Sequence, residues 1–508
     1  MQEPEQYDLV VVGGGINGVG IARDATGRGL RVLLCEKDDL AEHTSSASTK
    51  LIHGGLRYLE YYEFGLVRKA LKEREVLLRL APHIIWPLRF VMPHVASLRP
   101  AWMIRLGLFL YDHLSHRELL PASRGINLRR HPAGVPLVDL LVRGFVYSDA
   151  WVDDARLVVL NALDAKERGA TILTHTYFVS AEREASSWRI QLRSDGQPEK
   201  TIQARAIVNA GGPWASNLLQ QNMGQTEHAE LRLVKGSHII TRKLFDHDHA
   251  YIFQNPDKRI IFAIPYENEF TLIGTTDLEY RGDPSKVSIS PEEVSYLCDA
   301  VNTYFVKPIT PADVVWSYSG VRPLLAEEDA SNPSAVTRDY HLDVDAPENQ
   351  APLLSVFGGK ITTYRRLAED ALDLLAGPLA IEQPAWTGKA ALPGGDLPGG
   401  DFDAFLAGFV ARHPWLPASL AKRYARAYGS RAERLLGSAD SMETLGEELS
   451  PGLFEMEALY LMDQEWAISA DDILWRRTKL GLHATALSQQ RLADWLTAQS
   501  ERTATLAQ

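Results

Sequence analysis

The chain has 508 residues, more than one hydrophobic core usually supports, so we expect two or three domains. A hydrophobic fraction of 45% and a charged fraction of 23% are ordinary for a soluble globular enzyme. The formal net charge of −12 argues against nucleic acid as the main partner.

The compartment that we expect is the cytoplasm. Only two cysteines occur, Cys35 and Cys298, so a disulfide framework is not expected. The N-terminal sequence MQEPEQYD is acidic and polar, unlike a secretory signal peptide. A membrane span needs roughly 18 apolar residues. The best candidate, AWMIRLGLFLY, is shorter and is interrupted by Arg105, so no span is expected.

Residues 8–36 predict a dinucleotide-binding βαβ unit. A short buried strand is expected at Leu9–Val12 and a second at Val32–Leu34, with a helix-compatible run between them. A G-x-G-x-x-G turn joins the first strand to the helix. The combination is far more specific than a glycine motif by itself, which is often only a structural turn.

Each glycine of this turn has a mechanical role. Gly13 permits the tight turn, Gly15 lets a pyrophosphate approach the backbone, and Gly18 permits close packing of helix on strand. The phosphates would lie on free N–H groups at the start of the helix. Glu36 follows about twenty residues later, where a carboxylate accepts hydrogen bonds from ribose hydroxyls.

Residues 44–60, TSSASTKLIHGGLRYLE, form the second informative segment. Small hydroxyl side chains followed by two glycines make a polar loop whose backbone a ligand can approach closely. A simple nicotinamide enzyme has no obvious need for such a loop, whereas a flavin needs many backbone donors. The alternative is a serine-rich surface turn.

A basic and apolar stretch interrupts the acidic chain between residues 66 and 130. It contains twelve Lys/Arg against four Asp/Glu, together with large apolar residues such as Trp102, Met103 and Phe109. This composition suits an anionic membrane surface. A core helix whose arginines pair with acids elsewhere explains it equally well.

The remaining chain alternates between three kinds of pattern. Helices are predicted over 76–86, where Pro87 ends the helix, and over 154–168. A strand followed by a double glycine is predicted within 205–215. The same pattern, followed by a helix, is predicted within 353–375. Short strands are predicted at 171–179 and 188–192 and throughout 230–345, a linker at 392–401, and helices over 402–500.

The predicted fold class is α/β (α+β overall): a Rossmann-like FAD-binding domain, an inserted antiparallel β-rich substrate domain and a C-terminal helical domain. We expect the FAD-binding domain to be discontinuous. Its parts are 1–85, 146–220 and 349–388; the substrate domain is 221–348 with the basic excursion 86–145, and the helical domain is 389–508.

The chain resembles the aerobic, FAD-dependent glycerol-3-phosphate dehydrogenases, which belong to the D-amino acid oxidase-like flavoproteins. The segments that carry the resemblance are GGGINGVGIARDA, SSASTKLIHGGLRYLE, SLRPAWMIRLGLFLYDHL, YSDAWVDDARL, NAGGPWA, KGSHI, IGTTD, YSGVRPL and LLSVFGGKITTYR. The helical tail, with DDILWRRTKLG (residues 471–481), is also similar to that family. The resemblance thus covers nearly the whole chain.

The resemblance implies an activity and its partners. The reaction would be oxidation of sn-glycerol 3-phosphate to dihydroxyacetone phosphate, with hydride passing from C2 to FAD and electrons passing on to a membrane quinone. A quinone-linked enzyme without a membrane span must lie on the bilayer, which favours the membrane interpretation of the basic stretch. We therefore expect peripheral attachment to an anionic membrane surface, on the inner face of the cytoplasmic membrane, and a homodimer.

The substrate pocket is expected to be cationic. A phosphate dianion needs several cations near the flavin, and Arg57, Arg322 and Lys360 each lie beside a glycine-rich or cofactor-facing motif. Surface ion pairs are the alternative for any one of them. The resemblance implies that these positions line the substrate pocket, with Tyr58 and His238 nearby.

His238, in KGSHI, is the candidate catalytic base, with Arg322 and Arg57 as the other candidate catalytic residues. A neutral imidazole can accept the hydroxyl proton as hydride leaves the neighbouring carbon. A core histidine with satisfied hydrogen bonds is the alternative. A hydroxyl activated by arginine, whose proton is lost to water, also stays open.

The motif residues expected to contact FAD come from all three parts of its domain. They are Gly13, Gly15, Asn17, Gly18, Glu36, Ser45, Ser46, Ser48, Lys50, His53, Gly54, Gly55, Ala210, Gly211, Trp214, Gly359, Lys360, Ile361, Thr362 and Thr363. The family usually holds FAD non-covalently, and the loop offers no cysteine for attachment, although His53 could serve.

Other chemistries find less support. His113 and His116, and the HDH run at 247–249, lack further ligands at metal-binding spacing, so no metal site is expected. No G-x-S-x-G nucleophile elbow occurs, which leaves hydrolase chemistry unsupported.

Three alternative functions are compatible with this resemblance. A glycerol-3-phosphate oxidase would pass electrons to oxygen, but related oxidases are longer, with a central insertion that is not found here. An amino acid oxidase would need several cations for one carboxylate. A non-catalytic regulator that keeps a flavin fold would not need Arg57, His238, Arg322 and Lys360 together.

Overall fold

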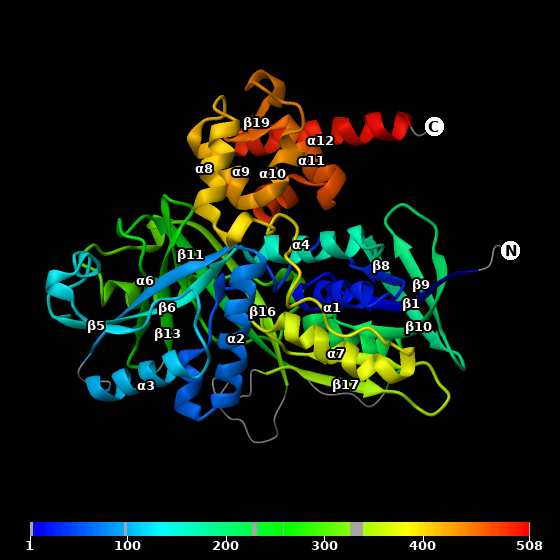
Figure 1. Cartoon of the computed structure of the whole chain (residues 1–508), viewed down its shortest axis with the longest axis horizontal. Helices are drawn as coiled ribbons and strands as arrows, with labels where there is room; N and C mark the ends of the chain where they lie inside the picture. The colour runs from blue at the N-terminus through cyan, green and yellow to red at the C-terminus, as the bar shows by residue number, and fades with distance from the viewer. Residues whose placement is uncertain (1–3, 96–98, 226–230, 258, 326–338, 507–508) are drawn as a thin grey trace.

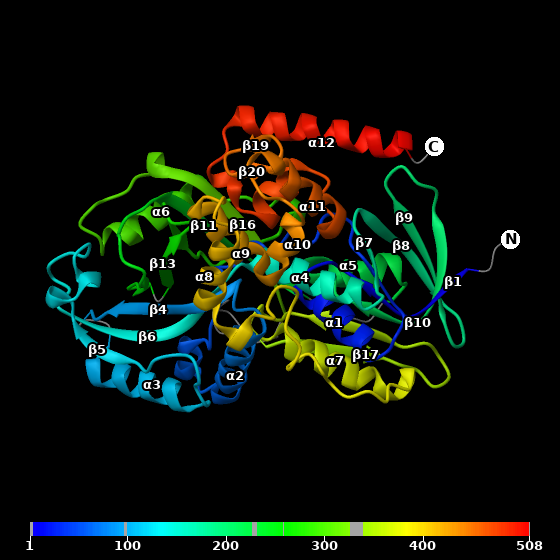
Figure 2. The same ribbon diagram turned by 45° about the horizontal axis from the view of Figure 1, so that its top comes forward.

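Two β-sheets lie side by side and a helical unit sits above both of them (Figure 1). The structure is a computed structural model that describes residues 4–95, 99–225, 231–257, 259–325 and 339–506. Figure 2 shows the same three parts from a tilted view, with the helical unit across the junction of the two sheets.

The first sheet is built mainly from parallel strands. Buried residues of the central strands alternate between its faces, so that Leu9 and Val11 point to one side and Val10 and Val12 to the other. The strand order is β17 (His341–Asp345), β18 (Leu353–Phe357), β10 (Lys200–Asn209), β1 (Glu5–Val12), β2 (Val32–Cys35) and β7 (Thr171–Leu173), with only β17 antiparallel to its neighbour.

Helices cover one face of this sheet and a β-hairpin covers the other. Leu9 and Val11 belong to the core cluster that also holds the apolar sides of α1 (Ile16–Gly27), α4 (Asp154–Glu167) and α7 (Tyr364–Leu379). Val10 and Val12 pack with β8 (Thr176–Arg183) and β9 (Trp188–Ser194), which continues the sheet through an antiparallel pairing with β10.

The second sheet is largely antiparallel and takes strands from separated parts of the chain. Its order is β15 (Leu278–Glu279), β11 (Leu231–Arg242), β14 (Phe270–Gly274), β13 (Ile260–Tyr266), β12 (Ala250–Gln254), β4 (Ile85–Pro93), β6 (Arg143–Val152) and β3 (Leu51–Ile52). Besides these, β16 (Val314–Leu325) pairs with β11, and β5 (Arg124–Asn127) with β6.

Helices pack on both faces of the second sheet because its strands are buried on both sides. Phe90 and Tyr147 pack with α2 (Phe64–Leu80) and α3 (Ala101–His113), while the neighbouring residues Val91 and Val146 pack with α6 (Pro291–Asn302). Both cysteines of the chain are buried and unpaired.

The prediction of a helix over 76–86 is wrong beyond Leu80. Helix α2 ends at Leu80, and β4 begins at Ile85 and runs through Pro87. Pro87 pairs with Ala150 of β6, whereas β12 pairs with β4 only farther along, so the missing N–H of Pro87 is tolerated.

The predicted domain limits also cut through elements: β6 crosses residue 145, and β17 lies in the first sheet before residue 349.

The C-terminal residues form a helical unit with a core of its own. Buried residues such as Phe409, Tyr424 and Leu461 hold it together. Its elements are α8 (Phe402–Arg412), α9 (Ala418–Tyr428), α10 (Ala432–Leu436), α11 (Glu455–Glu465), α12 (Ala486–Leu506), the hairpin β19 (Glu448–Ser450) and β20 (Leu453–Phe454), and the π-helical turn η11 (Asp472–Arg477). The predicted fold class is thereby confirmed.

Candidate functional site

A continuous groove runs from the glycine turn of the first sheet to the second sheet. It consists of two cavities, of about 310 Å³ and about 350 Å³, which share Gly15, Thr44, Ser45 and Ala210 among their lining residues. The shared residues come from the ends of β1 and β10 and from the loop after β2. In an open parallel sheet this carboxyl edge of the strands is where ligands bind.

The glycine turn has the geometry that a pyrophosphate requires. Gly13 has a φ of +113°, and a Cβ on Gly18 would lie 1.9 Å from the carbonyl oxygen of Gly13. Helix α1 begins directly afterwards, with Gly15 at its N-cap, and its Ile16 N–H donates to Ser45 Oγ (3.0 Å). The glycine backbone at the positive end of α1 lines the first cavity, where an anion can approach it.

Glu36 is held in the wall of the same cavity. Its Oε2 accepts a hydrogen bond from the Gly14 N–H (2.6 Å), and its Oε1 accepts one from the Asp38 N–H (3.0 Å). Burial raises the pKa of this carboxyl, while the two backbone N–H groups and the neighbouring His43 favour the charged form. The carboxylate is thus oriented before any ribose arrives.

Basic side chains gather in the second cavity. Arg57, Arg322 and Lys360 line it together, as the sequence predicted, and Arg259 joins them. Arg322 donates to Asp277 (2.9 Å), and the Lys360 ammonium lies 4.1 Å from the ring centroid of Tyr58. The cavity can bind a dianion because four basic side chains line it against two acidic ones, Asp149 and Asp277.

His238 lies behind the cavity wall. It is 1% exposed on β11, its Nε2 is 2.9 Å from Thr49 Oγ1, and its ring stacks on Tyr318 at 4.8 Å. Burial, and then the charges of Arg322 and Lys50, lower its pKa well below the usual value. The imidazole is therefore neutral and does not line the cavity, whereas its hydrogen-bond partner Thr49 does.

Several predicted contact residues support the wall instead of forming it. Lys50 is buried with φ +59° and pairs with Asp154 (2.8 Å), which also accepts from Ser48 Oγ (2.7 Å). Predicted residues that line neither cavity are Gly18, Ser46, Lys50, Gly54, His238 and Thr363. Those that do are Gly13, Gly15, Asn17, Glu36, Ser45, Ser48, His53, Gly55, Arg57, Tyr58, Ala210, Gly211, Trp214, Arg322, Gly359, Lys360, Ile361 and Thr362.

Sequence reasoning missed part of both walls. His43, whose ring lies 4.7 Å from that of Trp214, and Thr44 line the first cavity. Thr49 and Arg259 line the second. His43, Thr44 and Thr49 sit in or beside the serine-rich loop and could have been included with it. Arg259 lies just before β13 with no glycine or motif beside it, so only the folded sheet identifies it.

An exposed apolar face lies on α3 and the turn before α2. Trp102 is 66% exposed, and Met103, Leu106 and Phe109 are also exposed along the helix. Tyr61, in the turn at residues 56–61 that contacts α3, is exposed as well, and so are Tyr62 and Phe64 just after it. In the described part of the chain no helix is long and apolar enough to span a bilayer.

Comparison with known proteins identifies the class to which this fold and groove belong. The profile of the family described as "FAD dependent oxidoreductase" matches residues 8–365, and the one described as "C-terminal domain of alpha-glycerophosphate oxidase" matches residues 386–501. The chain belongs to the FAD-dependent oxidoreductases, and FAD is its cofactor.

Relatives with similar sequences have names that concern polyol phosphates. A glycerol-3-phosphate dehydrogenase of Pseudomonas aeruginosa is 56% identical, over 97% of this chain and 95% of its own length. A D-erythritol 1-phosphate dehydrogenase of Brucella abortus is 52% identical, over 97% and 98%. The FAD complex of the Bacillus halodurans glycerol-3-phosphate dehydrogenase superposes with a TM-score of 0.79 at 28% identity, covering 97% of this chain and 90% of that one.

The groove fits the two halves of FAD. Gly13, Gly15 and Glu36 would hold the pyrophosphate and ribose, because the two glycines bring no side chain into the first cavity and the carboxylate is already oriented. The small residues of the 44–50 loop and the backbone of residues 359–362 line the second cavity, where the flavin needs close approach.

Proposed function

We propose that the chain oxidises sn-glycerol 3-phosphate to dihydroxyacetone phosphate. The observation that carries the proposal is that four cations line the second cavity, together with the loop residues expected to approach the flavin. The name of the Pseudomonas aeruginosa relative supports the substrate. FAD, held by the glycine turn and Glu36, would supply the acceptor for a hydride from C2 of the substrate and the route for its electrons to a membrane quinone.

The chain's own residues have two tasks in this reaction. Arg57, Arg322 and Lys360 bind the phosphate, with Tyr58 beneath Lys360. His238 is one acceptor for the C2 hydroxyl proton, by way of the Thr49 hydroxyl within hydrogen-bond distance of its Nε2, but its lowered pKa makes it a weak base. Direct loss of the proton to water, from a hydroxyl activated by Arg322, is the competing route.

An anaerobic titration of the purified flavoprotein tests the substrate. Stoichiometric glycerol 3-phosphate should bleach the visible flavin absorbance, while glycerol and D-amino acids leave it unchanged. D-Erythritol 1-phosphate belongs in the panel because the Brucella abortus relative is named for it. Bleaching by that compound alone would move the substrate to a longer polyol phosphate, and no bleaching by either would contradict a polyol phosphate substrate.

We also propose peripheral attachment at the inner face of the cytoplasmic membrane, where the quinone is. The exposed apolar side chains of α3 support this, since an interfacial helix buries such residues at the boundary of the acyl chains.

The electron acceptor is tested by aerobic turnover. Peroxide formed stoichiometrically would identify a glycerol-3-phosphate oxidase instead of a quinone-linked enzyme. A homodimer is part of the same proposal and is tested by the mass of the detergent-free protein in solution.

A further inference from the structure

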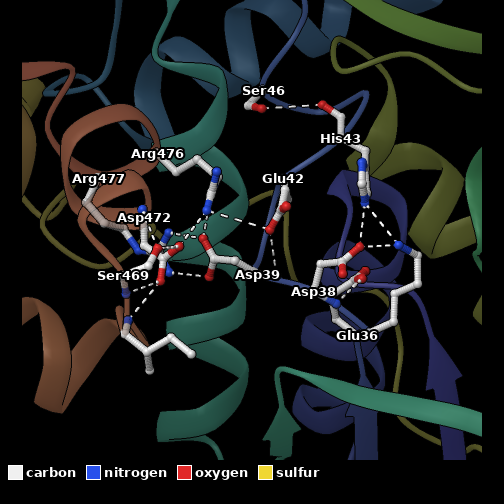
Figure 3. A network of polar contacts seen from close by, with 12 residues as sticks. Glu36, Asp38, Asp39, Glu42, His43, Ser46, Ser469, Asp472, Arg476 and Arg477 are labelled. Atoms are coloured by element: carbon white, nitrogen blue, oxygen red, sulfur yellow. Dashed lines mark hydrogen bonds and ion pairs between the residues drawn. The ribbon is translucent and has the colours of Figure 1, made fainter. Parts of the chain in front are cut away.

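The C-terminal segment 471–481, DDILWRRTKLG, has no part in the chemistry above, yet it contacts the FAD-binding domain at several points. Its η11 turn carries Arg476 and Arg477, and Figure 3 shows both pointing toward Asp39 of the loop after β2. Asp39 is three residues beyond Glu36, the carboxylate in the wall of the first cavity. The helical unit therefore touches the cofactor loop close to its ligand-facing acid.

The contact at Asp39 is a buried, bidentate ion pair. Arg477 Nη1 and Nη2 each lie 2.7 Å from an oxygen of Asp39, and neither side chain is exposed. Arg476 Nε adds a third hydrogen bond to Asp39 (2.6 Å) and pairs on its other side with Asp472. Burial by itself raises the pKa of Asp39, but the two arginines outweigh it and hold that pKa below its usual value.

The same segment supports the far end of the loop. Lys479 Nζ lies 3.4 Å from Asp153 and 3.8 Å from Asp154. Asp154 in turn holds Ser48 and Lys50. The loop that runs from Asp39 to Lys50, and that contributes Thr44 and Ser45 to both cavities, is thus fixed near its beginning and at its end by one segment of the helical unit.

A ring contact ties the segment to the second sheet as well. Trp475 stacks on Trp316 of β16 with ring centroids 4.0 Å apart. Tyr318, two residues farther along β16, packs on His238 and donates to the Ser48 carbonyl. The segment therefore contacts both parts of the protein that form the groove.

We propose that residues 471–481 are a positioning element for FAD: they hold the 36–50 loop in its binding conformation, so that retention of the cofactor depends on the helical unit. Asp39, Arg476 and Arg477 are positioning residues that act through Glu36 and the 44–50 stretch. Loss of Arg477 leaves the buried Asp39 with Arg476 as its remaining partner, and loss of Asp39 leaves the buried Arg477 without a counter-charge; either change forces local rearrangement. The inference depends on FAD and is independent of which polyol phosphate is oxidised.

The test measures FAD release from the full-length holoenzyme. Arg477→Gln and Asp39→Asn should each release FAD at least about tenfold faster on dilution, monitored by the rise in free-flavin fluorescence. Excess FAD should restore kcat without changing KM for the substrate. The double variant, which removes both charges, should hold FAD better than either single variant.

A matched control separates positioning from general instability. Arg423→Gln breaks a bidentate pair with Glu457 inside the same helical unit and leaves the loop contacts intact. It should lower the melting temperature with FAD release unchanged. Equal FAD loss from this control would overturn the inference.

A milder variant covers the case in which Arg477→Gln does not fold. Arg476→Gln removes a side chain that is slightly exposed and leaves the bidentate pair in place, so a smaller acceleration of FAD release is expected. Release at the native rate from folded Arg476→Gln and Asp39→Asn proteins would overturn the proposal.

Discussion

Arg322 depends on its neighbours for its position in the cationic cavity. It lies on β16 opposite Val234, and Asp277 and Thr275 hold its guanidinium at 2.9 Å and 3.3 Å. An arginine oriented in this way can offer a pair of parallel donors to a phosphate, which a lysine cannot.

Arg322→Gln should raise KM for glycerol 3-phosphate roughly tenfold to a hundredfold, since hydrogen bonds to charged groups contribute about 1.5–3 kcal/mol each. The FAD content should stay native. Steady-state assays with an artificial dye acceptor give the measurement. Arg281→Gln, which changes a well-exposed arginine, is the control and should leave KM as it is. An unaltered KM in Arg322→Gln would show that Arg322 does not bind the phosphate.

Gly18 shows how a single atom decides whether the cofactor turn can form. The ideal Cβ position lies 1.9 Å from the Gly13 carbonyl oxygen, an atom of the rigid backbone. Gly18→Ala should therefore yield protein depleted in FAD, measured as the ratio of visible to ultraviolet absorbance after purification. Gly377→Ala, on α7 with open space around the position, is the matched change and should keep its flavin. Full FAD occupancy in Gly18→Ala would refute the steric argument.

At the scale of an element, α3 differs from an ordinary surface helix. Its buried residues, including Leu108 and Tyr111, face the second sheet, while Trp102 and Met103 point outward. The sequence predicted a basic and apolar stretch here but could not decide between a core helix and an interfacial one. Exposure of the apolar residues, which only the packing of α3 against the sheet reveals, supports the interfacial interpretation.

Trp102→Glu or Met103→Glu should weaken binding to anionic phosphatidylglycerol vesicles by tenfold or more, because a large apolar side chain contributes about 1.5–3 kcal/mol on burial. Dye-linked activity should survive. Co-sedimentation with the vesicles provides the measurement, and Leu487→Glu, at an exposed apolar position of α12, serves as control. Native vesicle binding by both variants would exclude α3 as the attachment site.

At the scale of the whole molecule, the helical unit is joined to the FAD-binding domain through buried charge. Arg156 of α4 makes two hydrogen bonds to Glu465, and Arg426 donates to the carbonyls of Pro82 and His83. His83 itself is fully buried at this junction. Burial, and then Arg156 and Arg426, lower its pKa to about 3.

This pKa predicts acid sensitivity. Between pH 6.5 and about 3 the unfolded chain binds a proton at His83 and the folded protein does not, so stability must fall as the pH falls. The free energy of unfolding should decrease by about 1.4 kcal/mol per pH unit for one such group. Denaturant titrations from pH 8 to pH 5 should show a smaller decrease in the free energy of unfolding for His83→Asn than for wild type or for the exposed control His116→Asn. The same dependence of that free energy on pH in all three proteins would contradict the prediction.

Local patterns predicted the βαβ unit from residue 8 to Glu36, the discontinuous FAD-binding domain and most of the groove. These features depend on neighbours in sequence: a glycine turn, a strand period and an acid at a set spacing. Pro87 was wrongly taken as the end of a helix because its tolerance in β4 depends on a distant segment: β12 begins to pair with β4 only at Phe90.

What the sequence by itself determined is the cofactor class and the kinds of residue that bind an anion, since both are written in short motifs. Only the tertiary structure decided that Arg259 joins the cations, that Thr49 and not His238 lines the cavity, and that Arg477 reaches Asp39. Each of these is a contact between segments distant along the chain, and such contacts arise only when the two sheets and the helical unit pack together.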